Sequence, residues 1–562
     1  MTTQLLRLTF FSVASGGLSK GVWVKRHDDK AVVILKHPFQ CHLIGTVKLS
    51  VLSGCVNILG AKLTANGQWH NLYSPSSHML LKLTTEQPTG KDISQAKTQL
   101  SAMFSDAEQY TDLITSSVVV LLVSDLNWGF TDYIATIKPY QKLFQRPPEA
   151  EKLPYNKKLK PFTVSLLEKT EMMTSASSSE IDKFLTKWPL ILKNSDCPKV
   201  LLCGGKNTGK STFARILTNM ALETKKAVCI LDCDPGQTEF TPPGCVSLNV
   251  VKQFILGPPF CHQQDPAFNT FFGEVSPEGN RNHYMMCIRS AINYYLRMPE
   301  RLPLIINTMG WIKGPGKKML DGIINMIPPD HVVLLNSVKE RVNPSDLLPK
   351  NVMKNQWRFE GEASDRHVGS TCNWDLTVLK SVVRNVEKMT KLSNADLRSL
   401  TILSYLGKNW SPGVSLNHNV PYKIKWSSLA IHVCQEIVPP SQILYAINAS
   451  VVALCIADLT QGYRHNGDEN LPISFQKRPI CKCLGFGFVR GIQVETQMLY
   501  IVSPLPLNAI SQVNTLLRGP IYLPLDRLQT QDITDLMYVD KTLTKTTGSQ
   551  TLKKRQGIPR RN

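Results

Sequence analysis

Short apolar runs separated by turn residues fill roughly the first 160 residues of the chain. Val47, Leu49 and Val51 alternate with polar residues, which is typical of a strand with one buried face. Residues 118–123 form a six-residue apolar run that is rich in β-branched side chains and has the length of a buried strand. The pattern predicts a β-rich N-terminal domain over residues 1–165.

The composition changes over residues 166–194, where serines and small residues become frequent, and we interpret this stretch as a linker. The apolar pattern after it alternates between strand and helix. The expected strands are 199–203, 227–231, 302–307 and 331–335, and the expected helices are 210–223, 289–296 and 318–327. A strand, a helix and a strand within some thirty residues form a βαβ unit, so this alternation predicts a three-layer α/β domain with a mostly parallel sheet over residues 195–414.

The pattern becomes strand-like again after residue 415. The expected strands are 431–433, 451–456, 483–489 and 499–502. We therefore expect a C-terminal β-containing domain over 415–540, so that β-rich domains flank the central α/β domain on both sides. Residues 541–562 contain seven Lys and Arg and no acidic residue, and we expect a disordered basic tail suited to nuclear import or RNA contact.

The formal net charge of +21 favours polyanionic partners, with nucleic acid ahead of a membrane surface. No apolar run approaches the length of a membrane span, and the N-terminal run at 4–13 contains Arg7 and lacks a cleavage pattern. We therefore expect a protein that stays inside the cell. The fourteen cysteines include no C-x-x-C pair, and Cys481 and Cys483 fit reduced core residues on one face of a strand, so we expect neither a structural metal nor disulfides.

A phosphate-binding loop follows the first strand of the α/β domain. Residues 204–211 match G-x-x-x-x-G-K-[ST] at every fixed position. The predicted nucleotide-binding residues are Gly204, Gly205, Lys206, Asn207, Thr208, Gly209, Lys210, Ser211 and Thr212. Glycines let backbone N–H groups surround phosphate oxygens, Lys210 reaches the terminal phosphates and Ser211 holds Mg²⁺. The motif predicts a site for a nucleoside triphosphate, ATP or another.

Two carboxylates, Asp232 and Asp234, end the next strand along the chain. Ligands of an open parallel sheet bind outside the carboxyl ends of its strands, so both aspartates are expected to face the Mg²⁺-nucleotide. Phosphoryl transfer needs one carboxylate for the metal and one to accept the proton of the attacking hydroxyl. The sequence does not separate these two roles, and an acidic turn with neither role is the alternative.

Three further segments carry a resemblance to a known family. They are Asp232-Cys-Asp-Pro-Gly-Gln-Thr-Glu-Phe-Thr-Pro-Pro-Gly244, Leu256-Gly-Pro-Pro-Phe260 and Leu304-Ile-Ile-Asn-Thr-Met-Gly-Trp311. With the phosphate-binding loop, they resemble the nucleolar polynucleotide 5′-hydroxyl kinases of pre-ribosomal RNA processing. The related RNA kinase of the mRNA cleavage and polyadenylation machinery is less similar.

This resemblance implies transfer of the γ-phosphate of ATP or another nucleoside triphosphate to the 5′-hydroxyl end of RNA. It also implies a lid near residues 390–406, in which Arg398 closes over the transferred phosphate. Trp311 would stack on the terminal base and Gln237 would line the RNA side of the site. A packed core tryptophan and a helix-surface arginine are the alternatives for Trp311 and Arg398.

By the same resemblance, the cellular setting is the nucleolus, the process is removal of the second internal transcribed spacer, and a separate endoribonuclease is the partner. Two other functions stay open on the sequence. One is a P-loop ATPase or GTPase that assists ribosome assembly, and the other is a nuclease scaffold that retains nucleotide without transferring phosphate to RNA. The chain has no H-E-x-x-H arrangement, which argues against a zinc hydrolase of that type.

Overall fold

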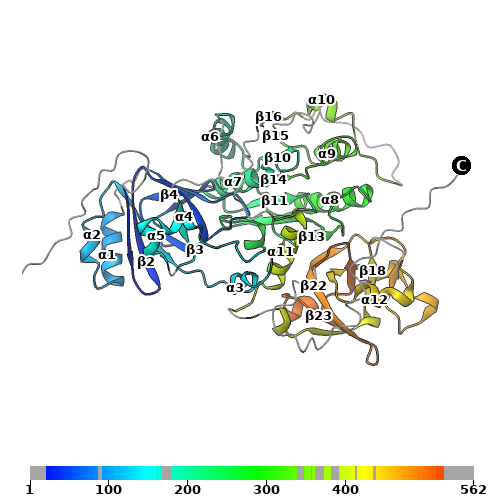
Figure 1. The fold of residues 1–562 in the computed structure, drawn as a ribbon. Helices are drawn as coiled ribbons and strands as arrows, with labels where there is room; N and C mark the ends of the chain where they lie inside the picture. The colour runs from blue at the N-terminus through cyan, green and yellow to red at the C-terminus, as the bar shows by residue number, and fades with distance from the viewer. Residues whose placement is uncertain are drawn as a thin grey trace, which may run out of the picture.

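The computed structural model describes residues 21–86, 92–160, 162–167, 179–337, 347–355, 357–360, 373–380, 392–411, 414, 416–434 and 438–523. The apolar run at 4–13, the basic tail and the first two residues of the expected lid lie outside the described residues. Figure 1 shows an N-terminal part in blue and cyan, a central part in green and a C-terminal part in yellow and orange. Within these ranges, no helix has the length and apolar character needed to cross a membrane.

The N-terminal part is a nine-stranded sheet with the order β1-β2-β8-β3-β7-β4-β5, in which β6 and β9 also pair with β3. Its strands are β1 (Val22–Arg26), β2 (Lys30–Lys36), β3 (Gln40–Ser53), β4 (Cys55–Ile58), β5 (Ala61–Thr64), β6 (His70–Ser74), β7 (Lys82–Glu86), β8 (Val118–Ser124) and β9 (Ser165–Leu167). Its helices are α1 (Ile93–Met103), α2 (Glu108–Thr111), α3 (Gly129–Ala135), α4 (Pro148–Glu151) and α5 (Pro154–Lys158). The strands expected near 47–51 and 118–123 are confirmed as β3 and β8.

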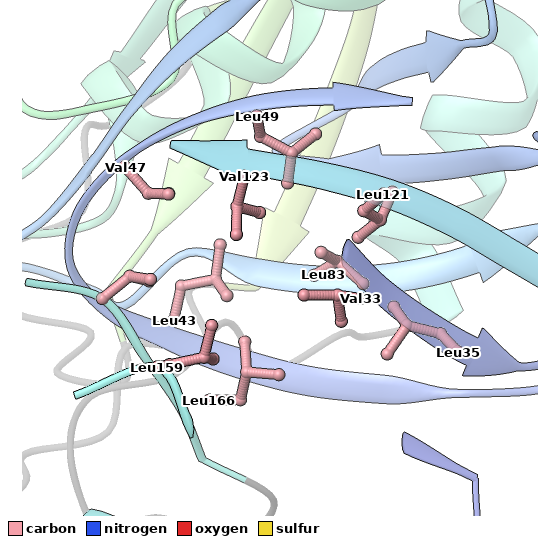
Figure 2. A pocket seen from close by; sticks show the side chains of 11 residues that line it. Val33, Leu35, Leu43, Val47, Leu49, Leu83, Leu121, Val123, Leu159 and Leu166 are labelled. Atoms are coloured by element: carbon pink, nitrogen blue, oxygen red, sulfur yellow. The ribbon is translucent and has the colours of Figure 1, made fainter. Parts of the chain in front are cut away.

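The inside of this sheet is a packed core. Figure 2 shows leucine and valine side chains from several strands pointing toward one another, and all eleven residues that line the internal cavity are Val or Leu. The cavity has a volume of about 20 Å³, room for roughly one water molecule. No polar side chain lines this cavity, so the cavity itself offers no group for catalysis or metal binding.

The central part contains a mixed sheet with the order β16-β15-β10-β14-β11-β12-β13. Its strands are β10 (Lys199–Gly204), β11 (Val228–Asp232), β12 (Cys245–Val251), β13 (Phe268–Phe271), β14 (Leu304–Asn307), β15 (His331–Asn336) and β16 (Asp375–Lys380). Its helices are α6 (Ser179–Asn194), α7 (Lys210–Leu222), α8 (Arg281–Leu296), α9 (Pro315–Met326), α10 (Pro349–Val352) and α11 (Asn394–Leu406), with the 3₁₀ turn η1 (Pro259–Cys261). The strands β16, β15, β10, β14 and β11 are parallel, whereas β12 and β13 are antiparallel.

Helices cover both faces of this sheet. Successive side chains of a strand point to opposite faces, and in β10 Val200 and Leu202 pack with α6 and α7 while Leu201 and Cys203 pack with α8 and α9. The continuous apolar run of β10 is therefore explained by burial on two sides. The expected three-layer α/β fold with a mostly parallel sheet is confirmed.

The expectation of a linker over 166–194 is wrong at both of its ends. Residues 166 and 167 belong to β9, which pairs with β3, and the second half of the stretch is helix α6. Phe184, Trp188 and Leu192 recur at four-residue spacing and are buried against the sheet. The serine-rich composition before this helix hid its apolar stripe, so the central domain begins at α6 rather than at residue 195.

The C-terminal part continues the same sheet through one bridge between Thr270 of β13 and Lys482 of β22. Its strands are β17 (Tyr422–Lys425), β18 (Ala430–Val433), β19 (Val451–Ile456), β20 (Gly462–Tyr463), β21 (Ser474–Phe475), β22 (Lys482–Gln493), β23 (Met498–Val502) and β24 (Thr515–Arg518), and its helices are α12 (Ile443–Ile447) and α13 (Leu507–Ile510). The strands expected in this region are confirmed as β18, β19, β22 and β23. Cys481 and Cys483 are buried free thiols at the start of β22.

The N-terminal part contacts the helix that carries the phosphate-binding loop. Asn219 of α7 is fully buried, and its side-chain amide donates to the carbonyl oxygens of Leu59 (2.9 Å) and Ile255 (3.0 Å). Its Oδ1 accepts the backbone N–H of Ile255 at 2.7 Å. One side chain therefore joins α7, the β4–β5 turn and the segment after β12.

Asn219→Ala should lower the free energy of unfolding by about 3 kcal/mol, because three buried backbone groups lose their hydrogen-bond partner. Urea unfolding followed by tryptophan fluorescence measures the change. Asn293→Ala, at an exposed position of α8, is the matched control and should change the free energy of unfolding by less than about 0.5 kcal/mol. Equal midpoints for the two variants would contradict the joining role of Asn219.

Candidate functional site

The phosphate-binding loop connects β10, the middle strand of the five parallel strands, to α7. Gly204 (φ +149°) and Gly209 (φ +94°) have backbone conformations that L side chains rarely adopt. A Cβ atom on Gly204 would also collide with the carbonyl oxygen of Leu335 in β15. These glycines let the chain turn tightly, so that α7 begins at Lys210 with its free N–H groups toward the loop.

The remaining loop residues divide into an exposed tip and a buried base. Lys206 and Asn207 are exposed, whereas Thr208 is buried and its hydroxyl donates to the Gly205 carbonyl at 3.0 Å. Ser211 and Thr212 are half-buried in the first turn of α7. All nine predicted nucleotide-binding residues therefore lie in one continuous strand–turn–helix segment.

Lys210 is folded against its own loop. Its side chain is 7% exposed, and Nζ donates to the carbonyl oxygens of Gly204 (3.1 Å) and Gly205 (2.9 Å). Burial lowers the pKa of Lys210, and the negative charge of Asp234 acts against this shift. The ammonium group thus lies within the loop that would surround the phosphates, and Asp234 lies close enough to influence it.

Asp232 ends β11 and is fully buried. Its Oδ2 accepts the backbone N–H of Glu239 at 2.7 Å, and its Oδ1 accepts the side-chain amide of Asn307 at 3.2 Å and the N–H of Asp234 at 3.3 Å. Burial raises the pKa of Asp232 to about 8, although the hydrogen bond from Glu239 opposes the shift. Both carboxylate oxygens are thus held by protein donors.

Along the chain, β11 is the next strand after β10. In the sheet, however, β14 lies between β10 and β11, so one strand separates the aspartates from the phosphate-binding loop. Asn307 ends this intervening strand and contacts Asp232, and Thr308 after it donates its hydroxyl to Leu202 of β10 at 2.8 Å. The end of β14 therefore links the loop to the acidic turn. The sequence motif did not indicate this intermediate strand.

Asp234 is half-buried, and only one of its oxygens is used by the protein among the described residues. Oδ1 accepts the N–H groups of Gly236 (3.0 Å) and Gln237 (3.2 Å). Burial raises the pKa of Asp234, while the positive charges of Lys210 and Lys206 oppose this shift. Asp234 therefore has one carboxylate oxygen that accepts no hydrogen bond from the described residues, and two lysine charges act on the group.

Arg398 lies on α11, near enough for Asp234 to affect its ionisation. Burial lowers the pKa of the half-buried Arg398, and the charge of Asp234 raises it. The charge of Asp234 thus acts on both Arg398 and Lys210. The predicted role of Arg398 in closing over a phosphate remains a prediction.

Helix α11 is anchored rather than loosely attached. Leu400, Leu403 and Leu406 are buried in a core shared with the N-terminal and C-terminal parts. At its other end Ser393 and Asp396 form a capping box. Any closing motion of the expected lid would therefore have to carry a packed helix or be confined to side chains.

The two predicted RNA-side residues flank the same edge of the sheet. Gln237 is exposed, and its side-chain amide donates to Oδ1 of Asn394, the first residue of α11, at 3.1 Å. Trp311 follows β14 and is half-buried, with part of its ring packed against the core beneath α8 and α9. Gln237 contacts Asp234 through its backbone N–H and not through its side chain, and the contact of Gln237 and Trp311 with RNA stays a prediction.

The donor set suits a hard divalent cation. Ser211 provides a hydroxyl oxygen, and Asp232 and Asp234 provide carboxylate oxygens, which are the ligands that Mg²⁺ takes together with substrate phosphates and water. The raised pKa values of both carboxyl groups show that burial disfavours their charge, and a bound cation would favour it. These residues therefore fit Mg²⁺.

A buried ion network behind the aspartates was not predicted from the sequence. Arg215 of α7 contacts Glu239 through two hydrogen bonds (2.6 and 3.1 Å), and Nε2 of His262 lies 2.8 Å from the same carboxylate. Burial alone would raise the pKa of Glu239, yet the charge of Arg215 and the contact with His262 hold it at about 2. The backbone N–H that holds Asp232 belongs to this clamped glutamate, and no local motif signals such a contact.

The C-terminal part supports the acidic turn from the other side. Arg478 is buried, donates to the carbonyl oxygens of Phe272 (2.5 Å) and Cys434, and forms an ion pair with Glu274 at 3.0 Å. The next residue, Val275, has its carbonyl oxygen only 2.6 Å from the position that a Cβ atom on Gly236 would occupy. The turn that holds Asp234 therefore rests against a segment fixed by the C-terminal part.

A phosphate-binding loop in a parallel sheet, a lysine within it, a carboxylate pair and an arginine that is influenced by the charge of Asp234 are the features of a P-loop kinase. Family models match three segments of the chain: the P-loop of the mRNA cleavage and polyadenylation factor CLP1 at residues 204–356, the N-terminal domain of polynucleotide 5′-hydroxyl-kinase NOL9 at 23–166, and a NOL9-like C-terminal domain at 417–524.

Curated relatives agree with these matches. Polynucleotide 5′-hydroxyl-kinase NOL9 of Danio rerio is 30% identical over 541 residues, which cover 91% of this chain and 74% of that protein. The proteins of the same name from Bos taurus and Homo sapiens are each 34% identical, and the alignments cover 54% and 53% of their lengths. Among solved structures, wild-type Clp1p in complex with Pcf11p aligns over 88% of this chain with 15% identity and a TM-score of 0.49.

The chain belongs to the polynucleotide 5′-hydroxyl-kinase NOL9 family. The resemblance that the sequence motifs carry is thereby confirmed.

Glu239→Gln should lower the free energy of unfolding by about 3 kcal/mol at pH 7, because it leaves Arg215 buried without its counter-charge. A carboxylate with a lowered pKa stabilises the fold above its unfolded pKa and loses this contribution as the pH falls toward its folded pKa of about 2. Urea midpoints of wild type and variant should therefore converge as the pH falls from 5 to 3.

Glu86→Gln is the matched control for this measurement, because Glu86 pairs with Lys62 at 2.6 Å in an exposed position. Its effect should stay below about 1 kcal/mol. A difference between Glu239→Gln and wild type that does not depend on pH would rule out the charge of Glu239 as the stabilising element.

Proposed function

We propose that this chain transfers the γ-phosphate of ATP, or another nucleoside triphosphate, to the 5′-hydroxyl end of RNA. The observation that carries the proposal is the position of Asp234, whose second carboxylate oxygen accepts no hydrogen bond from the described residues while cations surround the group. A proton acceptor placed between phosphate-binding cations is the arrangement that transfer to a hydroxyl needs. The names of the relatives support the same reaction.

In this mechanism the loop N–H groups and Lys210 hold the β- and γ-phosphates. Mg²⁺, held by Ser211 and Asp232, would neutralise developing charge on the phosphates. Asp234 accepts the proton of the 5′-hydroxyl, since it is the carboxylate with an available oxygen. Arg398, whose ionisation is influenced by the charge of Asp234, stabilises the equatorial oxygens of the transferred group and helps to exclude water.

The acceptor enters from the side of Gln237 and Trp311. Both follow strands that end at the same edge of the sheet, beyond the aspartates. The indole of Trp311 would stack on the terminal base, and stacking accepts any base. The net charge of +21 favours an RNA acceptor over a small molecule.

The wider role follows from the family and is part of the proposal. The acceptor would be pre-ribosomal RNA cut within the second internal transcribed spacer, the partner would be the endoribonuclease that leaves the 5′-hydroxyl, and the site of action would be the nucleolus. An assembly ATPase or GTPase and a nuclease scaffold remain the alternatives. An assembly NTPase would release phosphate without a 5′-hydroxyl end, and a scaffold would need neither Lys210 nor Asp234.

Lys210→Ala should lower transfer of labelled γ-phosphate to a 5′-hydroxyl RNA oligonucleotide by about 10²- to 10³-fold, the loss expected when one preorganised charge donor is removed. A matched 5′-phosphate oligonucleotide should remain unlabelled. Lys226→Ala, at an exposed position after α7, should transfer phosphate like wild type. Full transfer by Lys210→Ala would refute the role assigned to Lys210, and phosphate release by wild type regardless of RNA would favour the assembly NTPase.

Asp234→Asn and Asp232→Asn should separate the two carboxylates. Asp234→Asn should abolish transfer at every Mg²⁺ concentration while nucleotide binding persists, because the proton acceptor is lost. Asp232→Asn should retain some transfer but need more Mg²⁺. Initial rates of phosphate transfer, measured across a Mg²⁺ titration, distinguish the two variants. If Asp232→Asn abolished transfer and Asp234→Asn needed more Mg²⁺, Asp232 would be the proton acceptor and Asp234 the metal ligand.

A further inference from the structure

Arg281 lies beside the site and has no part in the mechanism above. It is the first residue of the sixteen-residue helix α8 and is exposed, and its Cζ atom lies 5.9 Å from the centre of the Trp311 ring. None of the described carboxylates forms an ion pair with it, and the neighbouring Glu274 is paired with Arg478 instead. Among the described residues, the guanidinium therefore lies over an aromatic face and forms no ion pair.

Two contacts place the Arg281–Trp311 pair at the mouth of the site. Tyr284, one helical turn after Arg281, donates its hydroxyl to the carbonyl oxygen of Cys233 at 2.6 Å, which puts the start of α8 beside the Asp232–Asp234 turn. On the other side, a Cβ atom on Gly310 would lie 2.8 Å from Cγ of Lys206. The pair therefore lies between the phosphate-binding loop and the proposed base.

The indole is fixed, whereas the guanidinium is free to move. Gly316 of α9 lies so close to Trp311 that an added Cβ atom would be 2.7 Å from its Cγ atom, and the rest of the ring packs on the core. Arg281 has an exposed, flexible side chain. A planar ligand that binds here would contact a rigid surface, the indole of Trp311, on one side and a movable side chain, that of Arg281, on the other.

We propose that Arg281 and Trp311 form a two-sided clamp that takes the unpaired 5′-terminal base of the RNA between the guanidinium and indole planes. This inference rests on the proposed kinase function. Two stacking contacts of about 3.5 Å each need about 7 Å between the planes, whereas Cζ of Arg281 lies 5.9 Å from the centre of the indole ring, so the guanidinium would move outward to admit a base. Guanidinium and aromatic planes both stack on splayed-out RNA bases.

The clamp makes a prediction about substrate choice. A base with both faces covered by protein can no longer stack on its 3′ neighbour, so the first nucleotide must leave the strand stack. Single-stranded and 5′-overhanging ends should therefore be phosphorylated faster than blunt or recessed ends. Removing the guanidinium plane should reduce this preference as well as the rate.

The test compares Arg281→Ala and Arg281→Lys with Arg289→Ala. Arg289 lies two turns later on α8, where its guanidinium stands 3.9 Å from the Phe359 ring, and serves as the matched control. We expect Arg281→Ala to lower kcat/KM for a single-stranded 5′-hydroxyl RNA about tenfold, as loss of one stacking face predicts, with the KM for ATP unchanged. Arg289→Ala should behave like wild type.

Arg281→Lys keeps the charge and removes the plane. The kcat/KM of Arg281→Lys should therefore resemble that of Arg281→Ala. Full activity of the lysine variant would refute the clamp and would indicate that Arg281 contacts a phosphate through its charge. Wild-type kcat/KM in Arg281→Ala would overturn the inference outright while leaving the kinase function standing.

A binding measurement without ATP separates the clamp from the reaction. Fluorescence of 2-aminopurine at the first position of a 5′-hydroxyl RNA should be quenched by the wild-type protein and much less by Arg281→Ala, whereas 2-aminopurine at the fourth position should report no difference. Quenching of this kind in a protein that transfers no phosphate would sustain the clamp and refute the kinase. Equal quenching at the first position in both proteins would refute the clamp.

Discussion

Two carboxyl groups buried at the end of one strand are the constraint on which the site depends. Burial raises the pKa of Asp232 and Asp234, so the protein must supply donors and cations if they are to carry charge. Asn307 and Glu239 provide hydrogen bonds to Asp232, and Lys210 provides charge beside Asp234. The two carboxyl groups therefore differ in environment: both oxygens of Asp232 accept hydrogen bonds, whereas Asp234 uses one oxygen among the described residues.

The N-terminal and C-terminal parts of the molecule support the site by holding its segments in place. In our proposal they contribute no reacting group. The N-terminal part holds the helix of the phosphate-binding loop through Asn219, and the C-terminal part holds the segment behind Gly236 through Arg478. Both contacts are buried and polar, so they fix relative positions more sharply than apolar packing alone.

Much of the fold could be predicted from the local pattern of apolar and polar residues. The elements that this pattern missed were missed for physical reasons. The phosphate-binding loop was predicted because its backbone requires glycines at fixed positions. The strands β10, β11 and β15 were predicted because burial on two faces requires continuous apolar runs. Helix α6 was missed because its three buried residues follow a serine-rich stretch, and the composition of the whole region is that of a linker. The position of β14 between β10 and β11 was missed because strand order is a long-range property.

The sequence by itself determined the chemistry that is available: a triphosphate loop, two aspartates two residues apart, an arginine and a tryptophan at motif positions. These are local features, since a turn or a helix start needs only neighbouring residues. Tertiary structure alone decided which aspartate has an available oxygen, that Arg215 and His262 clamp Glu239, and that Arg281 lies over Trp311. Each of these contacts joins residues more than twenty positions apart or depends on burial, and packing sets both.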